Sequence, residues 1–440
     1  MRPSTDDPVA DPTADPTADP AAGTVSGLLR DISGVGTDAR RGGYSRPVFS
    51  SAETELRCWF TEQARRRGLD VSTDANGIVW AWWDTDDGER RDAVVTGSHL
   101  DSVPGGGEFD GPLGVASALV AVDILRSRRF RPGRPLAIAV FPEEEGSRFG
   151  VACLGSRLLT GALDPDKARS LKDADGDTYA DVAAANGQDP RRIGADPAAL
   201  DQLGVFVELH VEQGRGLIDL DQPVAVGTSI LGHGRWRLSV HGQGNHAGTT
   251  LMTDRRDPMV AAARMMVEIR NIALQYRDAR ATVGRLQPVP GGTNVIPSRV
   301  DLWIDARHPR DEVTASLVES IHSRARLIAA EEGCTVTLDA ESLSPTVHFD
   351  PGLRDRLRTL LPVAPVLDTG AGHDAGVLAG RLPTAMLFVR NPSGISHSPE
   401  EWVEDADAEA GARALADVLQ GLLEAAGTPA SPLHAPMMAG

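Results

Sequence analysis

The 440-residue sequence contains only three cysteines, Cys58, Cys153 and Cys334, which are odd in number and far apart. This pattern excludes a disulfide framework and a cysteine zinc site, and it is typical of reduced thiols in a cytoplasm. No apolar run approaches the roughly 20 residues needed to cross a bilayer. The acidic start also lacks the basic and apolar regions of a secretory signal. We therefore expect a cytoplasmic protein that has no membrane partner.

Basic residues are outnumbered, because 44 lysines and arginines stand against 62 aspartates and glutamates, for a net charge of -18. That balance argues against a nucleic-acid surface and favours a small or neutral partner. The two ends, which include "ADPTADPTADP" and "ASPLHAPMMAG", are made of residues that cannot pack a core. We predict a disordered tail over residues 1–23 and a flexible tail over residues 428–440.

Apolar patterning predicts alternating strands and helices over the first half of the chain. A helical pattern over residues 49–68 is followed by strands at 77–83 and 92–100, a helix at 114–127 and a strand that begins at Pro135. Such alternation is typical of a mainly parallel sheet covered on both faces. Ligands of these sheets bind beyond the carboxyl ends of the strands.

The pattern changes between Gly232 and Ser342 to strand, helix, two strands, helix and strand. This βαββαβ order describes a compact two-layer unit that can fold separately. Strand and helix signals then resume and would complete the first sheet. We predict an α/β protein with a mainly parallel mixed sheet, in which a first domain of residues 24–231 and 343–427 carries an inserted domain of residues 232–342.

Histidines and acidic residues gather where the apolar strands stop. The stretch "TGSHLDSVPGGGEFDG" places His99, Asp101 and Asp110 among glycines that forbid a regular element. The segments "FPEEEG", "VFVELHVEQG" and "GISHSPEEW" supply further candidate ligands, namely Glu145, His210 and His397. Imidazoles combined with carboxylates suit zinc, manganese or a similar divalent ion. The set allows two ions, with Asp110 bridging them, His99 in one site and Glu145 in the other.

Neighbouring carboxylates can then take different roles. Asp101 lies two residues from His99 and is expected to accept the other imidazole N–H, which fixes the tautomer of His99. The run Glu143 to Glu145 would ordinarily be a solvated charge cluster, but it follows the apolar "LAIAVF" directly and so should face the cleft. We predict that Glu145 binds metal and that Glu144 accepts a proton from the attacking water.

Seven segments carry a resemblance to a known family. They are "GSHLDSVPGGGEFDGPLGV", "FPEEEGSRFG", "ELHVEQGRGL", "GNHAGTT", "GGTNVIPSRVDLWIDAR", "GAGHDA" and "GISHSPEE". In this order they resemble the dinuclear metal amidohydrolases that include allantoate amidohydrolase, N-carbamoyl-L-amino acid hydrolase and β-ureidopropionase, a branch of the aminoacylase and glutamate carboxypeptidase superfamily. The likeness extends over roughly residues 25 to 425.

The resemblance implies a role for each matching residue. Two divalent ions per subunit, zinc or manganese with cobalt or nickel as alternatives, would be held by five ligands with Asp110 bridging and Glu144 as general base. The ligands are His99, Asp110, Glu145, His210 and His397. It also implies that the inserted domain is a lid that pairs with the lid of a second subunit, giving a homodimer. His246 would stabilise the oxyanion, and the substrate would be bound by Gln213, Asn294, Arg307, Gly372 and His373.

These roles lead to a prediction of activity. We expect a metal-dependent amidohydrolase that cleaves the terminal carbamoyl C–N bond of a small ureido acid, with allantoate as the expected substrate. An N-carbamoyl-L-amino acid hydrolase or β-ureidopropionase is the close alternative, and a metallo-exopeptidase or aminoacylase is a more distant one. A catalytically dead binding protein would lack the base or a ligand, whereas all six residues are present. Arg307 has a second interpretation as an ion pair on the lid surface.

Overall fold

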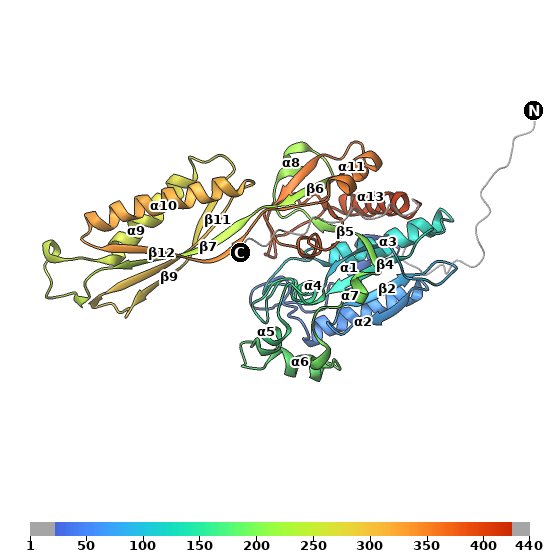
Figure 1. Cartoon of the computed structure of the whole chain (residues 1–440), viewed down its shortest axis with the longest axis horizontal. Helices are drawn as coiled ribbons and strands as arrows, with labels where there is room; N and C mark the ends of the chain where they lie inside the picture. Colours follow the sequence, from blue (N-terminus) through green and yellow to red (C-terminus); the bar gives the residue numbers. More distant parts are fainter. Residues whose placement is uncertain (1–22, 425–440) are drawn as a thin grey trace, which may run out of the picture. The chain divides into compact units, whose positions relative to one another are not determined.

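The computed structural model describes residues 23–424, and the chain divides into two compact units (Figure 1). Among the described residues, the first unit comprises 23–225, 356–365 and 386–424, and the second comprises Val226–Asp355 and Val366–Ala385. The predicted tails, 1–23 and 428–440, lie outside the described residues except for Gly23. None of the helices within residues 23–424 has the length and apolarity that a bilayer crossing requires.

The sheet of the first unit has the strand order β1-β2-β4-β3-β5-β15. Strand β3 runs parallel to β4 and β5, whereas β2 is antiparallel to β1 and β4. Both β3 and β4 are buried along their whole length, as expected of central parallel strands. The strands are β1 (Asp70–Thr73), β2 (Val79–Trp83), β3 (Ala93–His99), β4 (Leu136–Phe141), β5 (Leu203–Val211) and β15 (Thr384–Val389).

Helices cover this sheet. Helix α3 packs against β3 and β5, α1 and α13 pack against α3, and α2 packs against β1 and β2. Between β4 and β5 lie short helices with a small apolar core of their own, which the sequence pattern did not predict. The helices are α1 (Val25–Asp31), α2 (Ser51–Arg66), α3 (Pro112–Ser127), α4 (Leu154–Thr160), α5 (Pro165–Ser170), α6 (Tyr179–Ala185), α7 (Pro197–Leu200), α8 (Gly216–Leu220), α11 (Pro351–Leu360) and α13 (Asp405–Glu424).

The second unit contains a four-stranded antiparallel sheet in the order β12-β7-β11-β9, onto which two helices pack (Figure 1). Alternate strand residues such as Leu238, Val240 and Leu302 meet Met265 and Ile321 of the helices in its core. The elements in chain order are β7 (His233–His241), α9 (Pro258–Ala273), β9 (Arg280–Val289), β11 (Arg299–Arg307), α10 (Asp311–Glu331) and β12 (Thr335–Ser344).

This order is the predicted βαββαβ arrangement, and the predicted α/β fold class is confirmed. The second unit also holds most of β6, which pairs with β13 in antiparallel and with β14 in parallel fashion, and a two-stranded ribbon of β8 and β10. Their bounds are β6 (Val224–Ile230), β8 (Asn245–His246), β10 (Val295–Ile296), β13 (Val347–His348), β14 (Val366–Thr369) and α12 (Asp374–Leu378).

Candidate metal centre

Two histidines meet at the carboxyl ends of neighbouring parallel strands in the first unit. His99 is the last residue of β3, and His210 is the second-last residue of β5. Parallel strands end at the same edge of a sheet, so the two rings come together with centroids 5.7 Å apart. Both side chains are buried.

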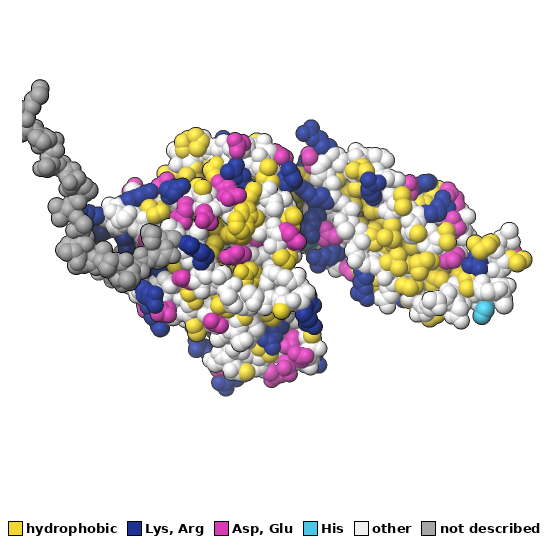
Figure 2. All heavy atoms as spheres, turned by 180° about the vertical axis from the view of Figure 1, so that it is seen from behind, with side chains coloured by type: hydrophobic (Ala, Val, Ile, Leu, Met, Phe, Trp, Pro, Cys, Tyr) yellow, Lys and Arg dark blue, Asp and Glu magenta, His cyan; other side chains and the backbone are white. Residues whose placement is uncertain are grey.

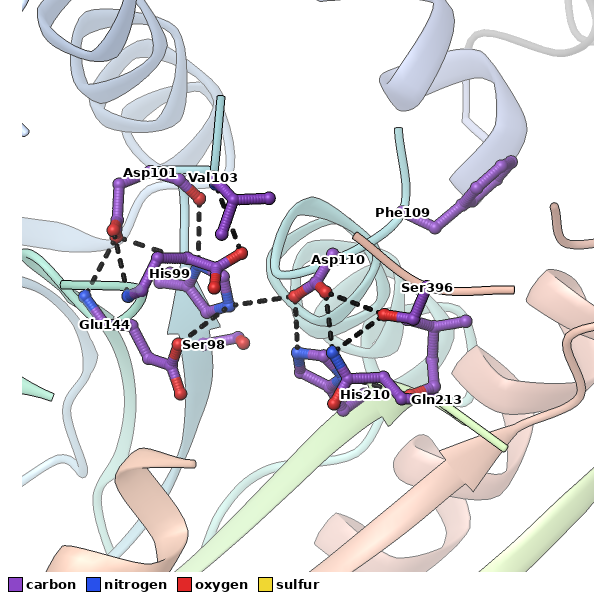
Figure 3. Close-up of polar contacts among 12 residues, drawn as sticks. Ser98, His99, Asp101, Val103, Phe109, Asp110, Glu144, His210, Gln213 and Ser396 are labelled. Atoms are coloured by element: carbon purple, nitrogen blue, oxygen red, sulfur yellow. Dashed lines mark hydrogen bonds and ion pairs between the residues drawn. The ribbon is translucent and has the colours of Figure 1, made fainter. Parts of the chain in front are cut away.

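Asp110 lies between these imidazoles (Figure 3). Its Oδ1 is 3.4 Å from Nε2 of His99 and 3.3 Å from Nε2 of His210. The next residue, Gly111, has a φ of 86°, and a Cβ atom there would lie 2.6 Å from the ring of His99. Only glycine therefore allows the chain to turn into α3 so close to the imidazole.

The hydrogen bonds of the two rings fix their tautomers. Nδ1 of His99 is 3.0 Å from the carbonyl oxygen of Asp101, and Nδ1 of His210 is 3.0 Å from that of Val211. Because a carbonyl oxygen only accepts, each Nδ1 carries a proton, and Nε2, which faces Asp110, is the nitrogen available to a cation. A carboxylate between two such nitrogens attracts a cation, either protons on the rings or a metal ion, so this donor set fits a divalent metal ion.

The charges around the two imidazole rings also favour a cation at this position. Burial alone would lower the pKa of His99, but Glu144, Asp110 and Asp101 raise that pKa well above its usual value. Burial would raise the pKa of Asp110, but the two histidines hold it well below the usual value. Carboxylates that stabilise a proton on buried imidazoles would also stabilise a dication there.

A second group of candidate ligands shares Asp110. Nε2 of His397 is 3.5 Å from Oδ2 of Asp110 and 3.4 Å from Oε2 of Glu145. The ligand atoms of this group lie within 4.8 Å of one another, as do those of the group formed by His99, Asp110 and His210. His397 has a φ of 57°, a conformation that non-glycine residues adopt rarely.

The three consecutive glutamates point to different partners. Glu143 accepts hydrogen bonds from the backbone N–H groups of Arg148 and Phe149 and so has a structural role. Oε2 of Glu144 is 3.7 Å from Nε2 of His99, whereas Glu145 faces His397. Glu143 and Glu144 are buried and Glu145 is half-buried, which excludes a solvated charge cluster.

Asp101 holds this loop in a way that differs from the sequence expectation. Its backbone carbonyl, not its carboxylate, accepts the imidazole N–H of His99. Its carboxylate instead accepts the backbone N–H groups of Glu144 and Glu145, both at 3.1 Å. Burial, followed by the charge of Asp110, raises the pKa of Glu145 to about 8. A bound cation would offset the negative charge of Asp110, which is the second cause of this raised pKa.

The predicted substrate residues lie in both units. Gln213 is in the first unit, where its Nε2 donates to Oδ2 of Asp110 at 2.7 Å and to Oγ of Ser396 at 3.0 Å (Figure 3). The others lie in the second unit, and these are His246, Asn294, Arg307, Gly372 and His373.

Within the second unit, these residues form two groups. His246 in β8 pairs with Val295, and the carbonyl of Asn294 accepts the N–H of Ala247 at 3.0 Å. Arg307 ends β11 and forms a bidentate ion pair with Asp305 at 2.7 and 2.9 Å. An ion pair was the second interpretation of this residue from the sequence. It also donates through Nη1 to the carbonyl of Gly370, which begins the loop that contains Gly372 and His373.

Two residues beside the site, Cys153 and Glu401, were not predicted from the sequence. The thiol of Cys153 is 3.6 Å from Oε1 of Glu144, and the carboxylate of Glu401 accepts the backbone N–H groups of Phe109 and Asp110. The adjacent acids of "SPEEW" were a signal for Glu401, but nothing in the sequence distinguished it from the exposed Glu400.

Comparisons with known proteins identify the family of this chain. Residues 95–421 match the model of peptidase family M20/M25/M40. The chain is 36% identical over 380 residues to N-carbamoyl-L-amino acid amidohydrolase of Geobacillus stearothermophilus, covering 85% of this chain and 92% of that protein. It is 31% identical over 396 residues to allantoate amidohydrolase of Escherichia coli K12, covering 89% and 95%.

Solved structures give the same result. An amidase of the hydantoinase/carbamoylase family from Burkholderia multivorans superposes with a TM-score of 0.80 at 32% identity, covering 90% of this chain and 97% of that one. The family resemblance stated from the sequence is thereby confirmed. The chain belongs to peptidase family M20/M25/M40, within its branch of carbamoyl- and ureido-acid amidohydrolases, and is a hydrolase of C–N bonds.

Proposed function

We propose that this protein hydrolyses the terminal carbamoyl C–N bond of a small ureido acid, and that allantoate is the substrate. The observation that carries the proposal is a single carboxylate, Asp110, shared by two adjacent groups of metal-ligand type. Relatives that align over most of this chain are named for N-carbamoyl amino acids and for allantoate. The ligands we propose are His99, Asp110, Glu145, His210 and His397, with zinc or manganese as the ions.

The ions, when bound, would polarise the carbamoyl carbonyl and lower the pKa of a water molecule to near neutrality. Glu144 is the proposed base that takes one proton as the water oxygen joins the carbamoyl carbon. It returns this proton to the leaving nitrogen when the C–N bond breaks. Ammonia departs, and the carbamic acid that remains loses carbon dioxide to leave the free amine.

The proposed substrate contacts come from both units. Arg307 uses three of its five N–H groups on Asp305 and Gly370, so two remain for a substrate carboxylate. Its bond to Gly370 also links it to the loop of Gly372 and His373. Asn294 would bind the ureido group together with Gln213, and His246 would donate to the developing oxyanion.

We also propose that the protein is a homodimer formed through the second unit. On α9, Val260, Val267 and the C-cap residue Leu274 are exposed and recur every seven residues, so they form an apolar stripe on one face. The space-filling view also shows hydrophobic side chains gathered on one face of this unit (Figure 2). Exposed apolar patches of this kind mark interaction surfaces, and a second copy of the chain is the occupant we propose.

An N-carbamoyl-L-amino acid is the alternative substrate, because the chain is more similar to that relative, at 36% identity, than to the allantoate enzyme at 31%. The test is an ammonia-release assay of the manganese- or zinc-loaded protein with allantoate, N-carbamoyl amino acids and β-ureidopropionate, with a dipeptide as control. Preferential turnover of allantoate is expected. Release of amino acids from the dipeptide without ammonia from any ureide would refute the proposal.

A further inference from the structure

Glu401 lies in the loop that follows His397, and its side chain is only 3% exposed. Its Oε1 accepts the backbone N–H of Phe109 at 3.1 Å and that of Asp110 at 3.0 Å, across sequence separations of 292 and 291 residues. Its neighbour Glu400 is exposed. One glutamate of the pair therefore joins the chain segment that carries Asp110 to the segment that carries His397.

The backbone at Gly107 lies so close to the carboxylate of Glu401 that a side chain at position 107 would collide with it. A Cβ atom on Gly107 would lie 2.3 Å from Oε1 of Glu401 and 2.5 Å from its carboxyl carbon. The φ of Gly107 is outside the left-handed region, so backbone strain does not require glycine there. The requirement is the close approach of the carboxylate.

The two groups of candidate ligands differ in how they are supported. His99 and His210 belong to central strands of the sheet, and the pairing of β3 with β4 extends to His99. Asp110 and His397 lie in loops, so other contacts must fix their separation. Gln213 holds the carboxylate of Asp110, and Glu401 holds its backbone.

We propose that Glu401 is a positioning residue, which fixes Asp110 relative to His397 and thereby sets the affinity of the ion bound by Asp110, Glu145 and His397. The inference rests on the proposed metal centre of the preceding section. The ion between His99 and His210 should depend less on Glu401, because two of its ligands are held by the sheet. Residues that orient metal ligands typically change metal affinity by ~10–100-fold when they are replaced.

The experiment is a metal titration of chelator-stripped full-length protein with Mn²⁺, followed by competition with a fluorescent indicator. Glu401→Leu removes the acceptor, whereas Glu401→Gln retains an oxygen for both N–H groups. Gly107→Ala displaces the carboxylate without changing Glu401 itself. We expect wild type and Glu401→Gln to bind two ions. Glu401→Leu and Gly107→Ala should bind the ion held by Asp110, Glu145 and His397 ~10–100-fold less tightly than wild type does.

Two matched controls separate positioning from general destabilisation. Asp74 also accepts two backbone N–H groups and an indole N–H, in the turn between β1 and β2. Asp74→Leu should lower stability and leave both metal affinities unchanged. Gly34→Ala adds a methyl group at a glycine with no atom within 4 Å and should change neither. Where Glu401→Leu does not fold, Gly107→Ala and Glu401→Gln decide.

The outcomes distinguish this inference from the proposed function. Equal affinities for both ions in wild type and in Gly107→Ala, or an equal loss in Asp74→Leu, would overturn the role of Glu401 alone. Two ions bound by wild type without hydrolysis of any ureide would overturn the proposed activity alone. A wild-type protein that binds fewer than two ions would overturn both.

Discussion

His246 and Arg307 lie at opposite ends of the sheet in the second unit. The β8–β10 ribbon, which carries His246, follows the end of β7 at His241 and precedes the start of β11 at Arg299, whereas Arg307 is at the other end of β11. Eight residue steps of about 3.4 Å separate Arg299 from Arg307, or roughly 27 Å of strand. A small ureido acid is much shorter than this. We therefore predict that each active site takes His246 from one chain and Arg307 from the other.

Mixed dimers test this prediction. His246→Ala removes a proposed oxyanion donor, which should lower kcat by ~10²–10³-fold, and Arg307→Ala removes the carboxylate clamp. The two variants are produced together with different affinity tags, and dimers that carry both tags are isolated. One site of each mixed dimer then holds both intact residues and the other site holds neither, so about half of the wild-type activity should return. The assay is ammonia release from the preferred ureide.

The control is a mixture of the two purified parent variants under conditions that prevent subunit exchange, which should remain inactive. If the mixed dimers are as inactive as their parents, both residues act from the same chain, and the argument from strand length fails. Isolation of the wild-type protein as a monomer with full activity would refute it as well.

Three further predictions concern the base, the metal and the core of the second unit. Glu144→Gln should reduce turnover by ~10²–10⁴-fold while leaving the bound ions in place, measured by ammonia release and metal analysis, and Glu53→Gln serves as the buried control. Removal of metal by a chelator should abolish hydrolysis, and added Mn²⁺ or Zn²⁺ should restore it; undiminished activity after stripping would contradict the metal centre. Leu302→Ala, at a fully buried position, should destabilise the protein by ~2–5 kcal/mol in denaturant unfolding, and a change below 1 kcal/mol would contradict the packing shown.

The sequence predicted the fold well where hydrophobic periodicity is strong. The strand at 92–100 and the helix at 114–127 correspond closely to β3 and α3, and the βαββαβ order of the second unit is as predicted. The region between β4 and β5 was not predicted, because its helices are short. They depend on capping by residues such as Asp164, Thr178 and Asp196 and on a local core, and an apolar pattern does not reveal these.

The candidate site was predictable from residue type and strand ends, but its supporting contacts were not. Histidine after an apolar strand identified His99 and His210, and their proximity follows from the parallel pairing of β3 with β5. The sequence could not distinguish the carbonyl of Asp101 from its carboxylate as the partner of His99, since both are attached to the same residue. Glu401 was missed because its role depends on a contact across 291 residues.

The two candidate ligand groups are built in different ways, and this difference bears on how the centre would work. His99, Asp110 and His210 are buried, and two of them lie on central strands, which gives this group the more rigid support. The side chain of His397 is 51% exposed and lies on a loop, so this ligand of the second group is open to solvent. An open position beside a rigid one is what a hydrolytic centre requires, because the substrate carbonyl and the attacking water must both reach the ions. The rigid group would therefore bind its ion first, and the loop group would be completed by the second.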